Sequence, residues 1–502
     1  MKKILISMLV VAGVLMSACS GRPSSLPSTF TEVADSARIY PDYRDVTIPP
    51  NIAPLNFMVL DDAADAFVAD LGGLVCGAGS DGKMDIDTAA WRSLLTAQRG
   101  KDIEVHIYAR RPQGWVRQPG FTLHVAEEDI DPYVTYRLIE PGYELYYQLG
   151  IYQRNLTNFD VTTIYENDRD KRQGESHCIN CHNFQNNGTE RMYLHVRENH
   201  RGTVVTHGQE AHKILIKHDS IIASGAYGNW HPFLPLVAFS TNKTEQFFHF
   251  KYHEKIEVFD QRSDLLLYDA EHNEVRHIIR TPDHFETFPC WSADGTRLYY
   301  CDAKMPPAKV SRADLAVIAS YDSLFYDLYS VPFDTATYTF GEPRLEVEAS
   351  AQGMSCSVPR VSPDGRYLLY ALALYGQFHL YHHSADLWVK DLQDSTVTAY
   401  PLTASNSPDA DSYHSWSSNS RWFVFSSRRD DGDYTRTYIA YFDRQGQGHR
   451  AFLLPQRDPE YNLMLLKSFN VPELTRTPVP FGQLEMEHVI KHTEAELATY
   501  KE

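Results

Sequence analysis

The chain has 502 residues, more than one hydrophobic core usually serves, so two or more domains are expected. Its formal net charge is −18, and so acidic a surface argues against nucleic acid as a partner, because phosphate binding needs clustered lysine and arginine. Aromatic residues are abundant, at 31 Tyr, 24 Phe and 7 Trp, while long helical periodicity is scarce. This composition favours an all-β chain.

The first residues have the pattern of an export signal. Two lysines precede an apolar run at residues 4–16, which is too short to span a bilayer as a stable anchor. The Met-Ser-Ala-Cys sequence that ends at Cys19 resembles the lipobox at which lipoprotein precursors are lipidated and cut. The resemblance implies a signal peptide at residues 1–18, a lipid on Cys19, and attachment to a membrane of the cell envelope, facing the periplasm or the cell surface. An ordinary cleaved signal with an incidental cysteine is the alternative.

The region after Cys19 is predicted to contain a tether and one domain. Residues 19–39 include a Ser- and Pro-rich stretch and are predicted to be a flexible lipidated tether. Residues 40–167 are predicted to form a β-sandwich-like domain with one short helix at residues 87–97, because short apolar runs alternate with turn signals. The predicted strands cover residues 46–48, 55–60, 103–109, 121–125, 133–138 and 143–152. Residues 168–188 are predicted to connect this domain with the next one.

Beyond residue 188 the chain repeats itself. Each repeat is an apolar hairpin followed by a further apolar strand, and the four clear copies begin at Trp230, Pro289, Pro359 and Trp416. In the third copy Pro363 fixes φ, Asp364 supplies a side-chain acceptor and Gly365 takes a positive φ, which predicts a tight turn. The fourth copy has Asn-Ser where Asp-Gly is expected.

The turn sequences Ser362-Pro363-Asp364-Gly365-Arg366 and Trp291-Ser292-Ala293-Asp294-Gly295 resemble the repeat motif of TolB-like β-propellers. The resemblance covers about residues 225–443 and implies a propeller over residues 189–475, with about six blades; five or seven are the alternatives. Residues 476–502 are left as a C-terminal tail with a short helix. Such propellers also precede hydrolase domains in certain peptidases, but this sequence has no Gly-x-Ser-x-Gly motif, so a serine peptidase is not expected.

The most informative motif is Cys178-Ile179-Asn180-Cys181-His182. Two cysteines two residues apart can each form a thioether bond to a haem vinyl group, and the adjoining histidine is then the proximal ligand of the iron. The motif resembles the attachment site of c-type cytochromes, where haem is attached after export, and the signal sequence predicts export independently. We therefore expect one covalent haem c, packed between the sandwich and the first propeller blade.

Other interpretations of the motif remain open. A structural zinc site needs further ligands, for which His177 or His195 would serve. A thioredoxin-like redox pair or a plain disulfide would use the two cysteines alone.

The sixth ligand of the iron is unassigned in the sequence. The candidates are Met192, His195, His200 and His207, which all follow the motif closely. A histidine would keep the reduction potential lower and a methionine would raise it. The cysteines without a predicted role are Cys76, Cys290, Cys301 and Cys356; of these, Cys290 and Cys301 flank a predicted hairpin and could form a disulfide.

Three functions fit these features. The first is a membrane-tethered monohaem electron carrier whose propeller docks an envelope redox or scaffold protein. The second is a haem enzyme or sensor with an open sixth position for peroxide or a gas. The third is a lipoprotein whose propeller binds another protein or a glycan without catalysis.

Overall fold

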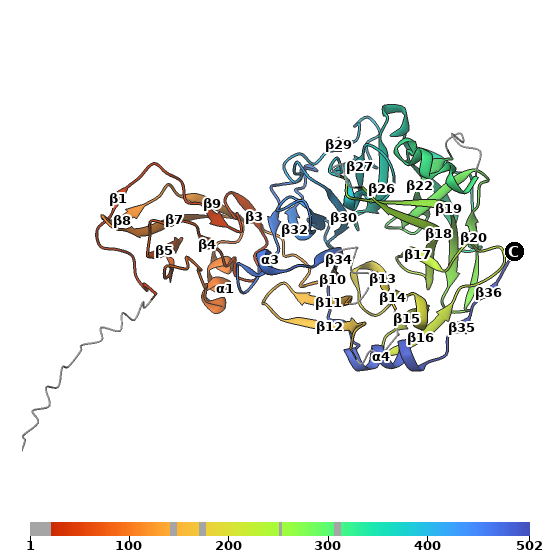
Figure 1. Cartoon of the computed structure of the whole chain (residues 1–502), viewed down its shortest axis with the longest axis horizontal. Coiled ribbons are helices and arrows are strands. Elements are labelled where there is room, and N and C mark those ends of the chain that lie inside the picture. The colour runs from red at the N-terminus through yellow and green to blue at the C-terminus, as the bar shows by residue number, and fades with distance from the viewer. Residues whose placement is uncertain (1–21, 141–147, 170–176, 250–253, 306–312) are drawn as a thin grey trace, which may run out of the picture.

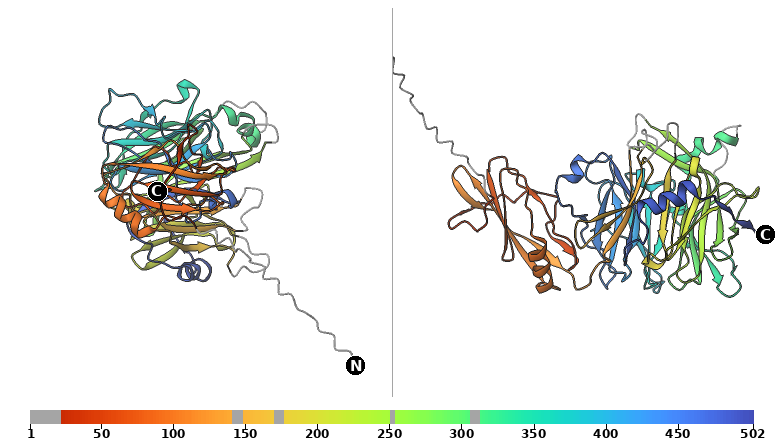
Figure 2. Two further views of the ribbon diagram at one scale, coloured as in Figure 1. Left: turned by 90° about the vertical axis from the view of Figure 1, so that its left-hand side faces the viewer. Right: turned by 90° about the horizontal axis from the view of Figure 1, so that it is seen from below.

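The structure is a computed structural model of the chain, and it describes residues 22–140, 148–169, 177–249, 254–305 and 313–502. The described residues form an N-terminal sheet region and, beside it, a ring of β-sheets (Figures 1 and 2). None of the helices in these ranges is both long and apolar enough to cross a membrane. The predicted signal peptide and Cys19 lie outside the described residues.

The N-terminal region is built on one seven-stranded sheet. Its strands are β1 (Thr31–Glu32), β3 (Val46–Ile48), β5 (Ala66–Leu71), β6 (Leu74–Ala78), β7 (Asp102–Arg111), β8 (Gly114–Arg117) and β9 (Phe121–Val125). The long strand β7 pairs with β5 on one side and with β8 and β9 on the other. Strands β2 (Ile39–Tyr40) and β4 (Met58–Val59) form a separate two-stranded sheet. The predicted β-sandwich remains a prediction.

The helix expected at residues 87–97 is confirmed as α1 (Thr88–Ala97). Asp87 caps its N-terminus, because that side chain accepts a hydrogen bond from the backbone N–H of Ala90 and so satisfies a donor of the first turn. The helix buries Trp91 and Leu95 against the sheet region.

Three strands that the sequence grouped with residues 40–167 lie in the ring. They are β10 (Tyr133–Ile139), β11 (Gly150–Asn155) and β12 (Val161–Glu166). They form an antiparallel sheet of order β12-β11-β10-β34, in which β34 (Ser468–Thr475) comes from near the C-terminus. This grouping has no local signal in the sequence, because the partner strand is distant along the chain. Part of the strand predicted at residues 143–152 lies outside the described residues.

The rest of the ring consists of antiparallel runs in chain order. The first two runs are β13 (Ile179–Phe184), β14 (Met192–Val196), β15 (Gly202–His207) and β16 (Glu210–Leu215), then β17 (Gly225–Trp230), β18 (Leu236–Phe248), β19 (Ile256–Asp269) and β20 (Glu274–Ile279). The third run is β21 (His284–Trp291), β22 (Arg297–Lys304), β23 (Asp327–Asp334), β24 (Thr339–Phe340) and β25 (Arg344–Val347). The last two are β26 (Ser355–Val361), β27 (Tyr367–Ala373), β28 (Asp386–Asp391) and β29 (Tyr400–Pro401), then β30 (Asp411–Trp416), β31 (Trp422–Ser427), β32 (Arg436–Tyr441) and β33 (Phe452–Leu453).

The first strand of each run faces the centre of the ring. Strand β13 contacts β17, β17 contacts β21, and the series continues through β26 and β30 to β34. Strand β34 also contacts β13, which closes the ring. The second and third runs are joined in one sheet by a single parallel pair between Ser263 and Phe285. This is a β-propeller arrangement in an all-β protein, and the predicted repeat hairpins are the pairs β17–β18, β21–β22, β26–β27 and β30–β31.

Short helices and the C-terminal tail complete the chain. The remaining helices are α2 (Ala313–Ala316), α3 (Tyr461–Met464) and α4 (Gln483–His492), with 3-10 turns at Gln185–Asn187, Glu198–His200, Ile318–Ser323, Ser350–Gln352 and His379–Tyr381. The helix predicted in the tail is therefore present. The chain beyond it forms β35 (Glu496–Leu497) and β36 (Thr499–Tyr500), which add parallel strands to β16 and β20.

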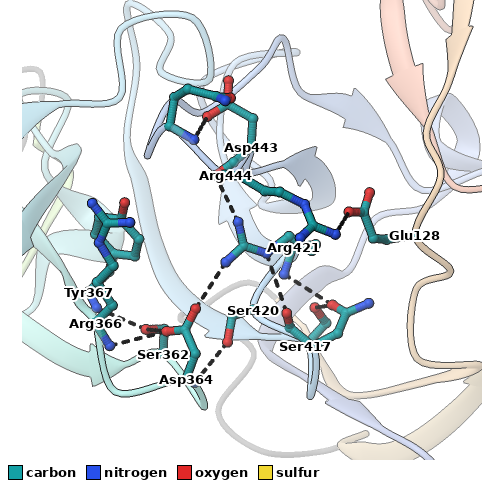
Figure 3. Close-up of polar contacts among 12 residues, drawn as sticks. Glu128, Ser362, Asp364, Arg366, Tyr367, Ser417, Ser420, Arg421, Asp443 and Arg444 are labelled. Atoms are coloured by element: carbon teal, nitrogen blue, oxygen red, sulfur yellow. Dashed lines mark hydrogen bonds and ion pairs between the residues drawn. The ribbon is translucent and has the colours of Figure 1, made fainter. Parts of the chain in front are cut away.

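The repeated turns share one hydrogen-bond pattern, which Figure 3 shows for the turns at Ser362 and Ser417. Ser362 Oγ donates to Asp364 Oδ1 over 2.6 Å and accepts from the N–H of Tyr367, while Gly365 has φ +73°. The same roles fall to Ser292, Asp294 and Gly295, and to Ser417, Asn419 and Ser420. The fourth copy thus keeps the turn although Ser420 replaces glycine at φ +60°.

Ion pairs join neighbouring runs and the N-terminal region at this edge of the ring. Arg421 binds Asp364 across two runs and donates to the carbonyl of Asp443, both over 2.9 Å, as Figure 3 shows. Arg444 binds Glu128 of the N-terminal region over 2.9 Å. The indole N–H of the fully buried Trp422 donates to the Glu128 carbonyl, so the two parts share one core.

Two turn glycines allow a matched test of this turn. Both Gly295→Ala and Gly365→Ala place a side chain at positive φ, which costs about 1 kcal/mol. At Gly295 the added methyl would also lie 2.3 Å from Nε2 of the buried His231, whereas at Gly365 the nearest atom is Ala293 Cβ at 3.5 Å. We expect urea unfolding to show a loss of about 1 kcal/mol for Gly365→Ala and roughly 2–4 kcal/mol for Gly295→Ala. Equal losses would contradict the packing of His231 on the turn.

Candidate functional site

The Cys-x-x-Cys-His motif lies at the centre of the ring. Cys178 immediately precedes β13, and Cys181 and His182 belong to that strand, which is the innermost of its run. Because β13 pairs with β14 and contacts β17 and β34, the motif is an integral part of the ring. The sequence assigned these residues to a connecting segment at residues 168–188, whereas the structure places Ile179–Phe184 on a strand of the ring.

A cavity of about 430 Å³, which we call the Cys178 cavity, opens beside the motif. Cys178, Cys181 and His182 all line it. The innermost strands contribute further residues, including Tyr227, Phe288, Val358, Tyr413 and Val471. Its volume lies within the range of small-molecule and cofactor pockets.

Aromatic rings form much of the wall of the Cys178 cavity. Besides the three on the inner strands, Tyr193, Phe378 and Tyr381 line it. The rings pack on one another, with centroids 4.5 Å apart for Tyr227 and Phe288 and 5.6 Å apart for Phe378 and Tyr413. Such a wall suits a flat, largely apolar ligand.

His182 has the properties of a metal-binding imidazole. The side chain is almost fully buried, and burial lowers its pKa to about 3, so the ring is neutral. Its Nε2 has no hydrogen-bond partner among the described residues, so the bond that the ring makes to the backbone of Thr135 runs through Nδ1. A neutral imidazole that is held through Nδ1 and keeps a bare Nε2 is the usual form of a histidine ligand.

The two cysteines of the motif are buried thiols. Burial raises the pKa of Cys178, while the nearby Arg137 and Arg197 oppose that shift. Cys181 Sγ accepts a hydrogen bond from the N–H of Tyr227 over 3.4 Å. All six cysteines in the described part of the chain are free, including Cys290 and Cys301, whose partners across the hairpin are Tyr299 and Thr287.

The structure gives little support to zinc. Within the described ranges no three His, Cys, Asp or Glu side chains are grouped so that they could hold a metal ion. The two histidines considered for this role have other partners: His177 Nε2 lies 2.7 Å from Tyr165 OH, and His195 Nδ1 lies 2.9 Å from Thr203 Oγ1.

None of the four candidate sixth ligands lines the Cys178 cavity. Met192 is fully buried in a different cluster with Phe184, because alternate residues of β14 face opposite sides of the sheet. His195 lines a separate cavity, His200 packs against His177, and His207 is exposed near Glu190. The described lining contains no methionine and, apart from His182, no histidine.

A glutamate that sequence reasoning missed lies next to the motif. Glu473 Oε2 is 4.0 Å from His182 Nε2, and Oε1 accepts from Asn183 Nδ2 over 2.7 Å and from the N–H of Phe184 over 3.0 Å. Burial raises the pKa of Glu473 to about 8. It lines a second cavity of about 200 Å³ on the turn side of the ring, which also touches His182 and Arg360.

A repeated feature of the inner strands explains this placement. Five of these strands have a residue at positive φ, namely Tyr227, Phe288, Val358, Tyr413 and Val471, and the pairing register shifts there. Two residues later come Asn229, Cys290, Arg360, Ser415 and Glu473, which all line the turn-side cavity. The Val-Pro pair before Arg360 recurs before Glu473, and this was the available sequence signal.

The residues present fit a covalently attached haem. The two thiols and the imidazole share one cavity with an aromatic wall, and the buried Nε2 of His182 has no hydrogen-bond partner in the described chain. Cys178 and Cys181 would hold the haem through thioether bonds, and His182 would bind its iron.

Comparison with known proteins identifies no family. No family model matches the sequence, and no curated protein matches it. Among solved structures, TolB from Acinetobacter baumannii aligns with a TM-score of 0.41 at 12% identity over 77% of this chain and 85% of that one. An ACO/RPE65 chimera aligns with a TM-score of 0.37 at 10% identity over 89% and 100%, and prolyl oligopeptidase B from Galerina marginata with 0.34 at 9% over 70% and 42%. Similarities this low carry no argument about function.

The raised pKa of Glu473 predicts a pH-dependent stability in protein prepared without haem. In the unfolded chain this carboxyl ionises near its ordinary pKa, so the folded state binds more protons between about pH 4 and pH 8, and stability falls as pH rises through that window. Glu473→Gln keeps the acceptor for Asn183 and cannot ionise. We expect it to stabilise the chain by roughly 2–4 kcal/mol at pH 9 and by little at pH 4, measured by urea unfolding. The exposed Glu494→Gln serves as control, and a difference that does not depend on pH would refute the assignment.

Proposed function

We propose that this chain is a membrane-anchored envelope protein that carries one covalent c-type haem in the centre of its propeller. Cys178 and Cys181 form the thioether bonds, His182 is the proximal ligand, and a lipid on Cys19 anchors the chain. The observation that carries the proposal is the meeting of the motif with an aromatic-walled cavity and a buried imidazole whose Nε2 has no hydrogen-bond partner in the described chain. We propose that the ring has six blades, each with its innermost strand at the centre, and that β34 with β10–β12 is the blade that closes it.

The protein's own residues orient the site. The hydrogen bond to the Thr135 backbone fixes the imidazole ring of His182. The low pKa of His182 keeps Nε2 unprotonated, and so able to bind iron, at every physiological pH. Tyr193 OH donates to the Gly228 carbonyl over 2.8 Å, which holds that ring in the cavity wall. When bound, the haem supplies one-electron redox chemistry and a coordination position for a small ligand.

The lining of the Cys178 cavity favours an open sixth position. A six-coordinate electron carrier needs a second strong ligand, and the described lining offers neither a methionine nor a second histidine. We therefore propose that the position takes a small external molecule such as peroxide or a gas, which makes the chain a haem enzyme or sensor.

Electron transfer to an envelope partner is the second candidate. It is favoured by the exposed residues at the rim of the Cys178 cavity, Arg197, Glu245 and Gln246, which bring the site near the surface of the ring. A partner docked on the propeller at this rim would approach the haem closely, and the lipid anchor would raise its local concentration.

Covalent attachment predicts haem that survives denaturation. We expect the full chain, exported together with a haem-ligation system, to give a c-type pyridine haemochrome spectrum and an intact mass increased by one haem. Cys178→Ala/Cys181→Ala should abolish both. The buried Cys76→Ala in the N-terminal region is the matched control and should retain both. Covalent haem in the double variant would overturn the site, and a haem-free parent would overturn the proposed function.

The open sixth position predicts a high-spin absorption spectrum that changes when cyanide or carbon monoxide is added. Met192→Leu, His195→Gln, His200→Gln and His207→Gln should leave the spectrum unchanged, because none of these side chains lines the cavity. A low-spin parent that becomes high-spin in one of these variants would instead identify that residue as the ligand and favour the electron carrier.

A further inference from the structure

Arginine side chains face the Cys178 cavity from several elements. Arg137 of β10, Arg197 after β14 and Arg360 of β26 all line it. The carboxylates in the same lining are Glu140 and the exposed Glu245. Arginine and aromatic side chains therefore share the wall of this cavity.

These arginines lie on different sides of the cavity. Arg137 and Arg197 are close enough to Cys178 to oppose the rise in its pKa that burial causes, so they lie on the side of the thiols. Arg360 belongs to β26. The inner strands follow one another around the ring in the order β13, β17, β21, β26, β30 and β34, so β26 lies opposite β13. Arg360 thus approaches the cavity from the side facing the motif.

Arg360 has no ion-pair partner among the described carboxylates within 4.0 Å. Its guanidinium donates to the carbonyl of the adjacent Pro359 over 2.8 Å and is half-buried. Arg360 opposes the burial-driven rise in the pKa of Cys290 and of Glu473, and both of these side chains line the turn-side cavity. Neither of them lines the Cys178 cavity, so a ligand there can supply the anion on that side of Arg360. A carboxylate is well suited to a guanidinium, with which it forms paired hydrogen bonds.

We propose that Arg360 binds the carboxylate edge of the porphyrin and so fixes the orientation of the porphyrin across the Cys178 cavity. The inference rests on the proposed function. A haem has its vinyl groups on one side and its two carboxylates on the other, so attachment at Cys178 and Cys181 directs the carboxylates away from β13. Arg360 is the arginine that the ring places there.

The test compares three substitutions in the full, haem-loaded chain. Arg360→Gln removes the cation, Arg360→Lys keeps it, and Arg297→Gln removes a half-buried arginine of β22 that lines neither cavity. A nearby cation stabilises the reduced haem, so Arg360→Gln should shift the one-electron equilibrium toward the oxidised form about tenfold, equivalent to about 59 mV. The lysine and control variants should shift it much less.

A second measurement uses haem-free protein with Cys178→Ala/Cys181→Ala. We expect it to bind mesohaem at least about tenfold more tightly than mesohaem dimethyl ester, because only the diacid forms the charge-assisted hydrogen bonds. Adding Arg360→Gln should remove this preference, and adding Arg297→Gln should preserve it. This assay tests the role of Arg360 even if the haem-loaded Arg360→Gln protein is not obtained.

The outcomes separate the two proposals. If the parent carries covalent haem but Arg360→Gln changes neither the potential nor the preference for the diacid, the role of Arg360 is overturned and the proposed function stands. If the parent carries no haem, the proposed function fails and this inference fails with it.

Discussion

The pairing of β34 with β10 is the constraint on which the rest of the structure depends. It joins a strand near the C-terminus to strands that precede the motif, and it brings β34 against β13. Without this pairing the sheets would leave an open edge, and the inner strands would not enclose the two central cavities. Glu473 reaches His182, and Val471 reaches the Cys178 cavity, only because this closure is made.

The closed ring gives the motif an environment that a loop would not provide. Burial keeps His182 neutral and the Cys178 thiol protonated, and the inner strands supply aromatic side chains from several runs at once. Each inner strand shifts register at the same level, so one residue from each strand is directed toward the axis. A single site is therefore assembled from side chains that are far apart in the sequence.

The N-terminal region is joined to this ring by hydrogen bonds, an ion pair and shared apolar packing. Glu128 accepts from Trp422 and pairs with Arg444, and Asp131 accepts from both the N–H and the hydroxyl of Ser418. The two regions also share a hydrophobic cluster. A lipid at Cys19 would thus hold the whole ring at the membrane through the sheet region, and the ring would keep a defined orientation to that region.

The sequence by itself determined the local features: the β composition, the hairpins with their Ser-x-Asp-Gly turns, the helix that starts at Asp87, and the Cys-x-x-Cys-His spacing. Each depends on residues within a few positions of one another. Only the tertiary structure decided that the motif is an inner strand and that β10 belongs to the ring. It also decided that Met192 faces another cluster and His195 another cavity, while Glu473 and Arg360 lie at the centre. These features depend on the closure of the ring and on which face of each strand points inward. Neither property can be recognised in a short stretch of sequence.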